Sequence, residues 1–253
     1  MYAEERQQEI LRRARAAGRV DVVTLAAELD VTTETIRRDL TSLERAGVLR
    51  RVHGGAIPVE RLGFEPALAT RDEVMTAEKE RIAKAALAEL PEDGSVIIDA
   101  GTTTGRLVQV LPADRELTVV VNSPPLATAL AARANLHVIM LGGRVRGKTL
   151  ATVDDWALRP LADLNVDVAF MAANGCSPAR GLTTPDPAEA AIKRAMVKAA
   201  QRSVLLADHT KFTNTYLARF AGLDEIDVLI TDTGLDVALA ADLAAAGPEV
   251  IRA

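Results

Sequence analysis

The sequence predicts two domains: a small helical domain that ends in a β-hairpin, and a larger α/β domain built on a mainly parallel sheet. Three observations support this prediction. The first 57 residues show helical apolar periodicity followed by a Gly-Gly pair, residues 58–76 have no clean period, and short apolar runs then alternate with helical segments. We therefore expect domains at residues 1–57 and 77–253, joined by a linker at 58–76.

The first domain is expected to contain three helices and a hairpin. Two helices are predicted at about residues 4–17 and 22–29, and a third is expected to start at a threonine N-cap, Thr32 or Thr33. Apolar residues recur in this third helix at i, i+4 and i+7, which indicates one buried face. Alternating residues around the Gly-Gly pair then predict a hairpin. The three apolar residues are Ile36, Leu40 and Leu43.

The solvent side of the third helix and hairpin is expected to contact DNA. Short polar residues begin the helix, arginines follow, and the hairpin adds arginines beside two glycines that permit close approach to a phosphate backbone. Such residues read base edges and phosphates when a helix lies in a major groove, and a hairpin after a helix-turn-helix makes a winged helix. Double-stranded operator DNA is therefore the expected partner. The candidate contacts are Thr33, Glu34, Thr35, Arg37, Arg38, Arg50, Arg51 and His53.

Composition and charge limit the other function classes. The chain has a net charge of −5, but residues 1–57 carry ten arginines against nine acidic residues, a net of +1, as suits a part that approaches phosphates. One cysteine excludes an internal disulfide, and three scattered histidines do not predict a metal site. Since no signal peptide and no apolar run of about 20 residues is found, we expect a cytoplasmic protein with no membrane partner, metal or cofactor.

The second domain is expected to alternate strands with helices. Strands are predicted at residues 96–98, 117–121, 138–141, 168–171, 204–207 and 228–230. Helices are predicted at about residues 78–90, 104–111, 124–134, 187–201 and 236–246. Because the predicted strands are apolar throughout, helices should cover both faces of the sheet.

Polar or glycine-bearing residues follow five of the predicted strands. After the first strand, a glycine turn would direct three threonine N–H groups and hydroxyls at one anion at a helix N-terminus. Because the carboxyl ends of parallel strands share one edge, we expect a pocket there for a small, polyhydroxylated, phosphorylated ligand. The candidate contacts are Asp99, Gly101, Thr102, Thr103, Thr104, Asn122, Ser123, Gly142, Gly143, Arg144, Asn174, Gly175, Lys193, Asp208 and Lys211.

Several of these motifs resemble the deoxyribose-operon-repressor (DeoR) family of bacterial transcription regulators. The motifs are EERQQEIL, VTTETIRRDLTSLERAGVLRRVHGGA, GLTTPDPAEAAIKRAM and LADHTKF. The resemblance implies a winged-helix DNA reader joined to an effector domain folded like ribose-5-phosphate isomerase. It also implies a phosphorylated sugar effector, with a fructose phosphate as a family-level expectation. Two positions depart from the family: Asn174 stands where it often has aspartate, and Asp154 where it commonly has glycine after valine.

An enzyme on the same scaffold, a sugar-phosphate isomerase or deaminase, is the alternative function. Such chemistry needs a carboxylate or imidazole tuned to move a proton. The candidates are Asp99, Asp186, Glu189 and Asp208, and none of them stands in a motif that pairs a base with an acid. We therefore expect no catalytic residues, and a homodimeric or homotetrameric repressor that a phosphorylated sugar releases from DNA.

Overall fold

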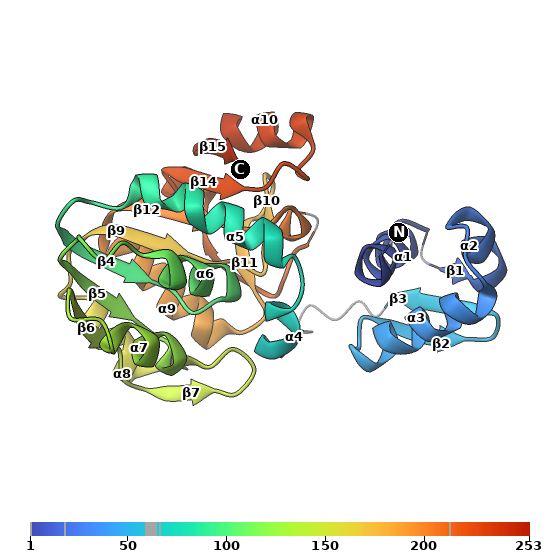
Figure 1. The fold of residues 1–253 in the computed structure, drawn as a ribbon, viewed down its shortest axis with the longest axis horizontal. Helices are drawn as coiled ribbons and strands as arrows, with labels where there is room; N and C mark the ends of the chain where they lie inside the picture. The colour runs from blue at the N-terminus through green and yellow to red at the C-terminus, as the bar shows by residue number, and fades with distance from the viewer. Residues whose placement is uncertain (1, 18, 59–64, 66, 213) are drawn as a thin grey trace. The chain divides into compact units, whose positions relative to one another are not determined.

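The computed structural model describes residues 2–17, 19–58, 65, 67–212 and 214–253, and the chain divides into two compact units, Met1–Pro66 and Ala67–Ala253 (Figure 1). Most of the predicted linker, residues 59–64 and 66, lies outside the described residues. The rest of that segment differs from the prediction. A short helix, α4, and the start of α5 already belong to the second unit.

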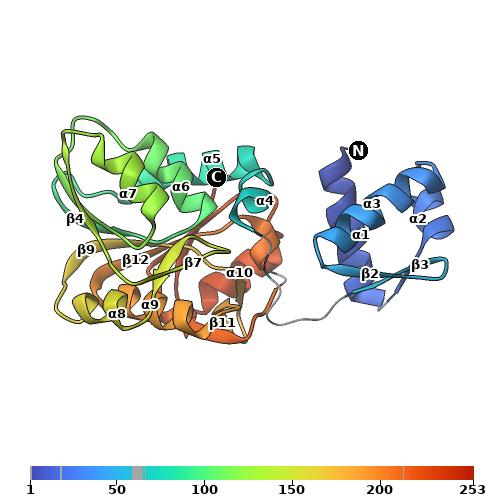
Figure 2. The same cartoon turned by 90° about the horizontal axis from the view of Figure 1, so that it is seen from below.

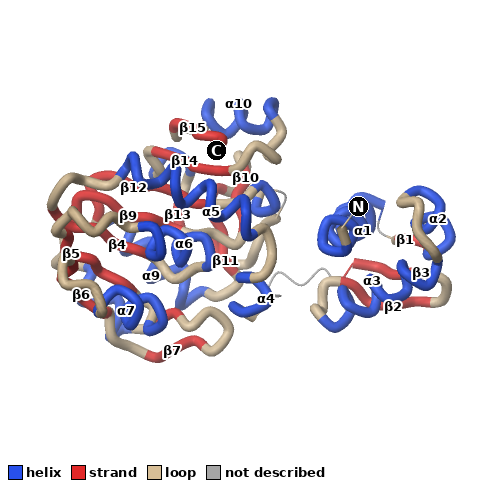
Figure 3. The backbone as a smooth tube through the Cα atoms, in the orientation of Figure 1, coloured by secondary structure: helices blue, strands red, loops and turns tan. Residues whose placement is uncertain are grey.

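The first unit consists of three helices and a small antiparallel sheet (Figure 3). Its elements are α1 (Ala3–Ala17), β1 (Val20–Asp21), α2 (Val22–Glu28), α3 (Thr33–Arg45), β2 (Leu49–Val52) and β3 (Gly55–Pro58). The strand order is β1-β3-β2. The apolar face predicted for α3 is buried against α1 and α2. Thr32 is the N-cap of α3, because its hydroxyl accepts a hydrogen bond from the Thr35 N–H at 3.2 Å.

The two hairpin glycines are required for different reasons. Gly54 has a φ of +79°, which other residues rarely adopt. Gly55 pairs with β1 so closely that an added Cβ would lie 1.9 Å from the Val20 carbonyl oxygen. The hairpin is therefore anchored to the strand that precedes α2.

The second unit is built around a seven-stranded sheet in which every neighbouring pair is parallel. Its strands are β4 (Gly94–Ile98), β5 (Leu117–Val121), β6 (Leu136–Met140), β9 (Val166–Met171), β12 (Ala200–Leu206), β14 (Val228–Thr231) and β15 (Glu249–Arg252). Its helices are α4 (Leu68–Asp72), α5 (Thr76–Ala85), α6 (Thr102–Val110), α7 (Pro124–Ala131), α8 (Asp155–Leu161), α9 (Pro187–Lys198) and α10 (Val237–Ala245). Short 3-10 turns lie at η1 (Ala86–Glu89), η2 (His209–Lys211) and η3 (Leu223–Glu225).

Helices cover both faces of this sheet, as its apolar strands predict (Figure 2). Along β4, Val96 and Ile98 pack in the cluster that holds α5, α6 and α7, while Ile97 packs on the opposite side with α8 and α9. Adjacent strand residues point to opposite faces, so continuous apolar runs are what a doubly covered sheet needs.

The strand order is β15-β14-β12-β9-β4-β5-β6. The chain moves outward from β4 through β5 to β6, returns to β9 beside β4, and then continues outward the other way through β12. The order therefore reverses between β4 and β9. In open parallel sheets, ligands bind at the carboxyl ends of the strands at such a reversal.

Two small antiparallel sheets lie outside the large sheet and were not predicted. They consist of β7 (Arg144–Arg146) with β8 (Ala151–Val153), and of β10 (Gly175–Ser177), β11 (Gly181–Thr184) and β13 (Ala218–Ala221). These strands have three or four residues each, too few for a period to be recognised. Within the described residues, no helix is both long enough and apolar enough to cross a bilayer.

Candidate functional site

The exposed face of α3 and the adjacent strand β2 form an arginine-rich hollow of about 450 Å³. Its lining residues are Glu34, Arg37, Arg38, Thr41, Ser42, Arg45 and Arg51. Four of these seven residues are cationic, against one carboxylate, so the hollow favours an anionic partner. Three lining residues were not among the predicted contacts, although their spacing from Arg38 places them on the same helical face: Thr41, Ser42 and Arg45.

A buried ion pair fixes α3 against α1. Asp39 is 3% exposed, and its Oδ2 accepts a hydrogen bond from Arg6 Nε at 2.5 Å. The side-chain amide of Gln7 donates to the other oxygen, Oδ1, at 3.0 Å. Asp39 is thus turned away from the arginine-rich face and orients side chains of α1.

The hairpin of β2 and β3 is hydrogen-bonded to α3, the helix that precedes it. The backbone N–H of Arg51 donates to Glu44 Oε1 at 2.9 Å, and its guanidinium donates to the Thr41 hydroxyl at 3.2 Å. Arg50, Arg51 and His53 are all exposed. The remaining predicted contacts, Thr33 and Thr35, lie half-buried in the first turn of α3.

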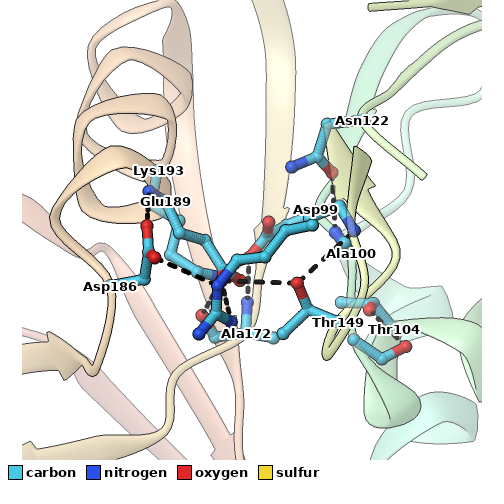
Figure 4. Close-up of polar contacts among 12 residues, drawn as sticks. Asp99, Ala100, Thr104, Asn122, Thr149, Ala172, Asp186, Glu189 and Lys193 are labelled. Carbon is cyan, nitrogen blue, oxygen red and sulfur yellow. Dashed lines mark hydrogen bonds and ion pairs between the residues drawn. The ribbon is translucent and has the colours of Figure 1, made fainter. Parts of the chain in front are cut away.

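In the second unit, a buried ion pair occupies the point where the strand order reverses (Figure 4). Asp99 follows β4 and is fully buried, and Lys193 on α9 is 2% exposed. Lys193 Nζ donates to Asp99 Oδ2 and, at 3.0 Å, to the carbonyl oxygen of Ala172, which follows β9. The Ala172 N–H also donates to Asp99 Oδ2 at 3.0 Å. These contacts join the carboxyl ends of β4 and β9.

Two fully buried polar atoms at this position have no hydrogen-bond partner among the described residues: Asp99 Oδ1 and Asn122 Nδ2. Asn122 follows β5, and its side-chain oxygen accepts a hydrogen bond from the Ala100 N–H at 2.8 Å. An unsatisfied buried acceptor and donor each cost roughly 1–3 kcal/mol. A polar ligand bound beside the glycine turn would satisfy both atoms.

The turn itself leads into α6 as the sequence predicts. Gly101 is the N-cap residue and is too close to neighbours for a side chain, since an added Cβ would lie 2.8 Å from the Ala172 Cβ. Thr103 and Thr104 are buried, and the Thr104 hydroxyl donates to the Gly101 carbonyl at 3.1 Å. Thr104 thus stabilises the turn, while the half-exposed Thr102 starts the helix. The first N–H groups of a helix lack intrahelical acceptors, which makes this N-terminus suitable for an anion.

Three more charged side chains form ion pairs near Lys193: Glu189, Arg146 and Asp186. Glu189 lies one turn before Lys193, with Oε1 at 4.0 Å from Nζ, and is 1% exposed. Arg146 of β7 pairs with Glu189 Oε2 at 2.9 Å and with Asp186 Oδ2 at 3.1 Å. The sequence did not indicate Arg146, because it lies on a three-residue strand far from these partners in the chain.

Another cluster forms at the carboxyl end of β12. Asp208 is fully buried, and its Oδ2 lies 3.5 Å from Lys211 Nζ. Burial raises the pKa of Asp208, but Lys211, Thr210 and Lys79 outweigh this effect, and the pKa lies below its usual value. Lys79 is 2% exposed, and burial lowers its pKa to about 8. The sequence did not indicate Lys79, which lies on α5, the helix that precedes the first strand.

The remaining predicted contacts lie outside the Asp99 cluster. Ser123 is the buried N-cap residue of α7, and Gly142 and Gly143 are exposed residues before β7. Asn174 donates its N–H to the Thr183 carbonyl at 3.2 Å. Gly175 begins β10, where an added Cβ would lie 2.3 Å from the Asn214 carbonyl oxygen. Close strand packing therefore accounts for this last glycine.

The family models identify both units. Residues 6–61 match the DeoR-like helix-turn-helix domain, and residues 74–233 match the DeoR C terminal sensor domain. The chain belongs to the DeoR family. It is a transcription regulator with a DNA-binding domain and a sensor domain, and not an enzyme.

Full-length relatives are similar to this DeoR-family chain. The HTH-type transcriptional regulator GlpR of Haloferax volcanii is 36% identical over 251 residues, which cover 99% of this chain and 98% of the relative. The HTH-type transcriptional regulator IolR of Bacillus subtilis is 32% identical over 221 residues, 87% of each chain. Among solved structures, ribose 5-phosphate isomerase A from Neisseria gonorrhoeae matches with a TM-score of 0.41 and 18% identity, over 60% of this chain and 57% of that one.

One departure from the DeoR pattern has a structural consequence. Asp154, where the family commonly has glycine, adopts a φ of +75° and a ψ of −174° at the start of α8. This region of backbone conformation is almost restricted to glycine. The Asp154 carboxylate accepts a hydrogen bond from Arg144 Nε at 2.8 Å, and both side chains are exposed. The ion pair therefore holds Arg144 at Asp154 rather than at the Asp99 cluster.

Proposed function

We propose that this DeoR-family regulator represses a sugar-utilisation operon and leaves its operator when a phosphorylated sugar occupies the second unit. Two copies would place two α3 helices in successive major grooves, since helix-turn-helix proteins read paired half-sites as dimers. The chain would act as a homodimer or homotetramer in the cytoplasm.

One observation supports the ligand part of this proposal most strongly. Asp99 Oδ1 and Asn122 Nδ2 are an acceptor and a donor, both buried and both without partners among the described residues, beside the N-terminus of α6. A sugar hydroxyl can accept from the amide and donate to the carboxylate. The N-terminus of α6 suits the phosphate of the same molecule. A fructose phosphate has both groups, as have other phosphorylated sugars.

The pairing of the carboxylates supports binding rather than catalysis. Asp99 and Asp208 each lie against a lysine, and Asp186 and Glu189 share Arg146. A carboxylate in an ion pair is already engaged by its cation, whereas a general base needs an oxygen within hydrogen-bond reach of a substrate proton. These four residues are the ones that a proton-transfer enzyme on this scaffold would use.

The DNA part is tested by a selection from random duplex DNA followed by fluorescence anisotropy. Arg38→Ala should lose sequence-specific binding, because Arg38 is an exposed residue that lines the α3 hollow. Arg159→Ala removes another exposed arginine, from α8 of the second unit, and should bind as the parent protein does. Equal loss in both variants would show that net charge, not α3, determines DNA affinity.

The ligand part is tested by thermal shift against a panel of phosphorylated and unphosphorylated sugars. The double variant Asp99→Asn with Lys193→Met removes the buried pair as a whole, which avoids leaving one uncompensated charge. We expect this variant to fold, to bind operator and to lose the stabilisation by sugar phosphate. An unchanged shift in the variant would place the ligand elsewhere in the protein.

A further inference from the structure

Helix α4 is held on the second unit by polar contacts at both of its ends. The Leu68 N–H donates to the Lys148 carbonyl oxygen at 3.0 Å. At the other end, Arg106 Nη2 lies 3.2 Å from the carbonyl oxygen of Asp72 and 3.2 Å from its Oδ1. None of the five residues of α4 is buried. So short a helix is not stable by itself, and α4 depends on these contacts.

The same arginine lines a groove that reaches the proposed phosphate position. This groove has a volume of about 430 Å³ and is bordered by α4, α6 and α7. Gly101 and Thr102 line it at the start of α6, and Leu68 and Asp72 line it from α4. A ligand bound at the N-terminus of α6 would therefore lie in a groove of which α4 forms one wall.

Arg106 has donors left for such a ligand. It follows Thr102 by one helical turn, so the two side chains lie on the same face of α6. The Arg106 side chain is 14% exposed. Its Nη2 contacts Asp72, whereas its Nε is buried and has no hydrogen-bond partner among the described residues. A guanidinium presents five donors in a planar fork that fits phosphate oxygens.

The charges around the end of α4 favour an added anion. Lys79 Nζ donates to the carbonyl oxygen of Arg71, in the last turn of α4, and at 2.6 Å to that of Val74, just after this helix. Burial lowers the pKa of Lys79 to about 8, and the nearby Lys211 and Arg106 contribute in the same direction. Two carboxylates, Asp72 and Asp208, oppose them. Lys79 and the two cations that act on it thus face two carboxylates, and a phosphate nearby would be attracted to these cations.

We propose that Arg106 binds the phosphate of the ligand and that its ion pair with Asp72 is the latch which phosphate binding opens. This inference rests on the proposed function, in which a phosphorylated sugar lies at the N-terminus of α6. A phosphate carries more charge than one carboxylate and accepts two parallel N–H bonds from a guanidinium. Arg106 therefore moves from Asp72 to the phosphate, and α4 loses one of its two C-terminal contacts, while the contact of Lys79 with the Arg71 carbonyl oxygen stays.

The consequence concerns the chain that leads to the DNA-binding unit. Helix α4 is the first helix of the second unit, directly after the segment 59–66. While α4 is fixed, the chain enters the second unit at a fixed point. When α4 loosens, this point of attachment gains freedom, and two DNA-binding units lose more conformational entropy when they occupy two half-sites together.

Hydrogen exchange of the full-length protein tests this latch. The exchange is measured by mass spectrometry in inorganic phosphate and in sodium chloride of matched ionic strength. We expect phosphate to slow exchange at residues 102–106 and to speed it about tenfold at residues 68–73, which corresponds to about 1.4 kcal/mol. Opposite changes in two neighbouring segments are not expected from general stabilisation by an anion.

Two variants separate the two roles of Arg106. Asp72→Asn removes the ion pair of the latch but keeps Arg106, which would bind the phosphate. Residues 68–73 should therefore exchange faster than in the parent protein without phosphate, and phosphate affinity should rise severalfold. Arg106→Gln removes both, so the same residues should exchange fast and phosphate affinity should fall about tenfold. Arg159→Gln, an exposed arginine on α8, is the matched control and should change neither.

The outcomes distinguish the latch from the proposed function. Slowed exchange at residues 102–106 with no change at 68–73 would overturn the latch and leave the ligand position intact. Wild-type affinity for phosphate in Arg106→Gln would overturn its role as a ligand. No slowing at residues 102–106 in the wild-type protein would overturn the ligand position and the latch together.

Discussion

At the scale of the residue, Asp154 carries a conformational cost that glycine would not. Its φ of +75° with a ψ of −174° costs a non-glycine residue on the order of 1–3 kcal/mol. The ion pair with Arg144 offsets little of this, because both side chains are exposed, at 62% and 44%, and surface ion pairs contribute at most about 1 kcal/mol.

We therefore expect Asp154→Gly to stabilise the protein by about 1 kcal/mol, even though glycine lowers the stability of most folded positions. Denaturant unfolding measures the difference. Asp155→Gly is the control one residue along the chain, at the first residue of α8, and should destabilise the protein. A loss of stability in Asp154→Gly would show that the contact with Arg144 outweighs the backbone strain.

The contact between His209 and Asp232 predicts a pH dependence. The two side chains meet at 2.7 Å, and this hydrogen bond raises the pKa of His209 above 6.5. The folded-state pKa exceeds the unfolded value. The contribution to stability is therefore full below about pH 6.5 and is lost as the pH rises through the folded-state pKa.

Nuclear magnetic resonance titration of the imidazole tests this assignment. In Asp232→Asn the pKa of His209 should fall, because the hydrogen bond to a carboxylate and its negative charge are both lost. The difference in unfolding free energy between the parent protein and this variant should also shrink as the pH rises. A pKa of His209 that Asp232→Asn leaves unchanged would contradict the attribution.

At the scale of the element, the contact between α1 and α3 depends on a buried charge pair. Asp39→Ala would leave the Arg6 guanidinium buried without its carboxylate, which costs about 3–5 kcal/mol. Glu34→Ala on the same helix removes an exposed ion pair with Arg37 and should cost less than about 1 kcal/mol. Hydrogen exchange of the α3 amides measures both variants. Equal protection in the two would show that apolar packing alone holds α3.

Long elements with a clear period could be predicted from the sequence, and short ones could not. The apolar repeat of Ile36, Leu40 and Leu43 and the continuous apolar strands identify α3 and the parallel sheet, because burial imposes those patterns directly. Helix α4 has no buried side chain, and β1, β7 and β10 have two or three residues each. Their positions depend on tertiary contacts that no local pattern records.

The candidate site was predicted in part for the same reason. Asp99, Asn122 and the threonine turn follow strands, so the sheet brings them to one edge. Lys193 was identified from its motif, and its position over Asp99 is a tertiary result. Arg106 and Lys79 lie on helices at positions where a solvent-exposed charge is the ordinary expectation. Their burial and their contacts with α4 distinguish them from surface residues.

At the scale of the whole molecule, DNA affinity should depend steeply on salt. Each arginine that neutralises a phosphate releases a counterion, so log affinity falls linearly with log salt. Arg51→Ala, on the hairpin, should make this slope shallower by about one, if Arg51 contacts one phosphate. Anisotropy titrations at several salt concentrations measure the slope. An unchanged slope would assign the arginine to a base edge instead.

The proposed regulation requires a modest coupling free energy. A 100-fold loss of operator affinity on effector binding corresponds to roughly 2.7 kcal/mol of preference for the non-binding arrangement. A few charge-assisted hydrogen bonds that exist only in the ligand-bound arrangement can supply this. Arg106 with phosphate, and a sugar hydroxyl at Asp99 and Asn122, are candidates for these bonds.

The most direct test is operator release measured by fluorescence anisotropy during titration with the sugar phosphate that stabilises the protein most. The parent protein should leave its operator as the ligand saturates. The Asp99→Asn, Lys193→Met variant should remain bound at every concentration, with unchanged affinity for operator in the absence of ligand. Release of this variant at the parent concentration of ligand would contradict the assignment of the buried pair and glycine turn as the sensing site.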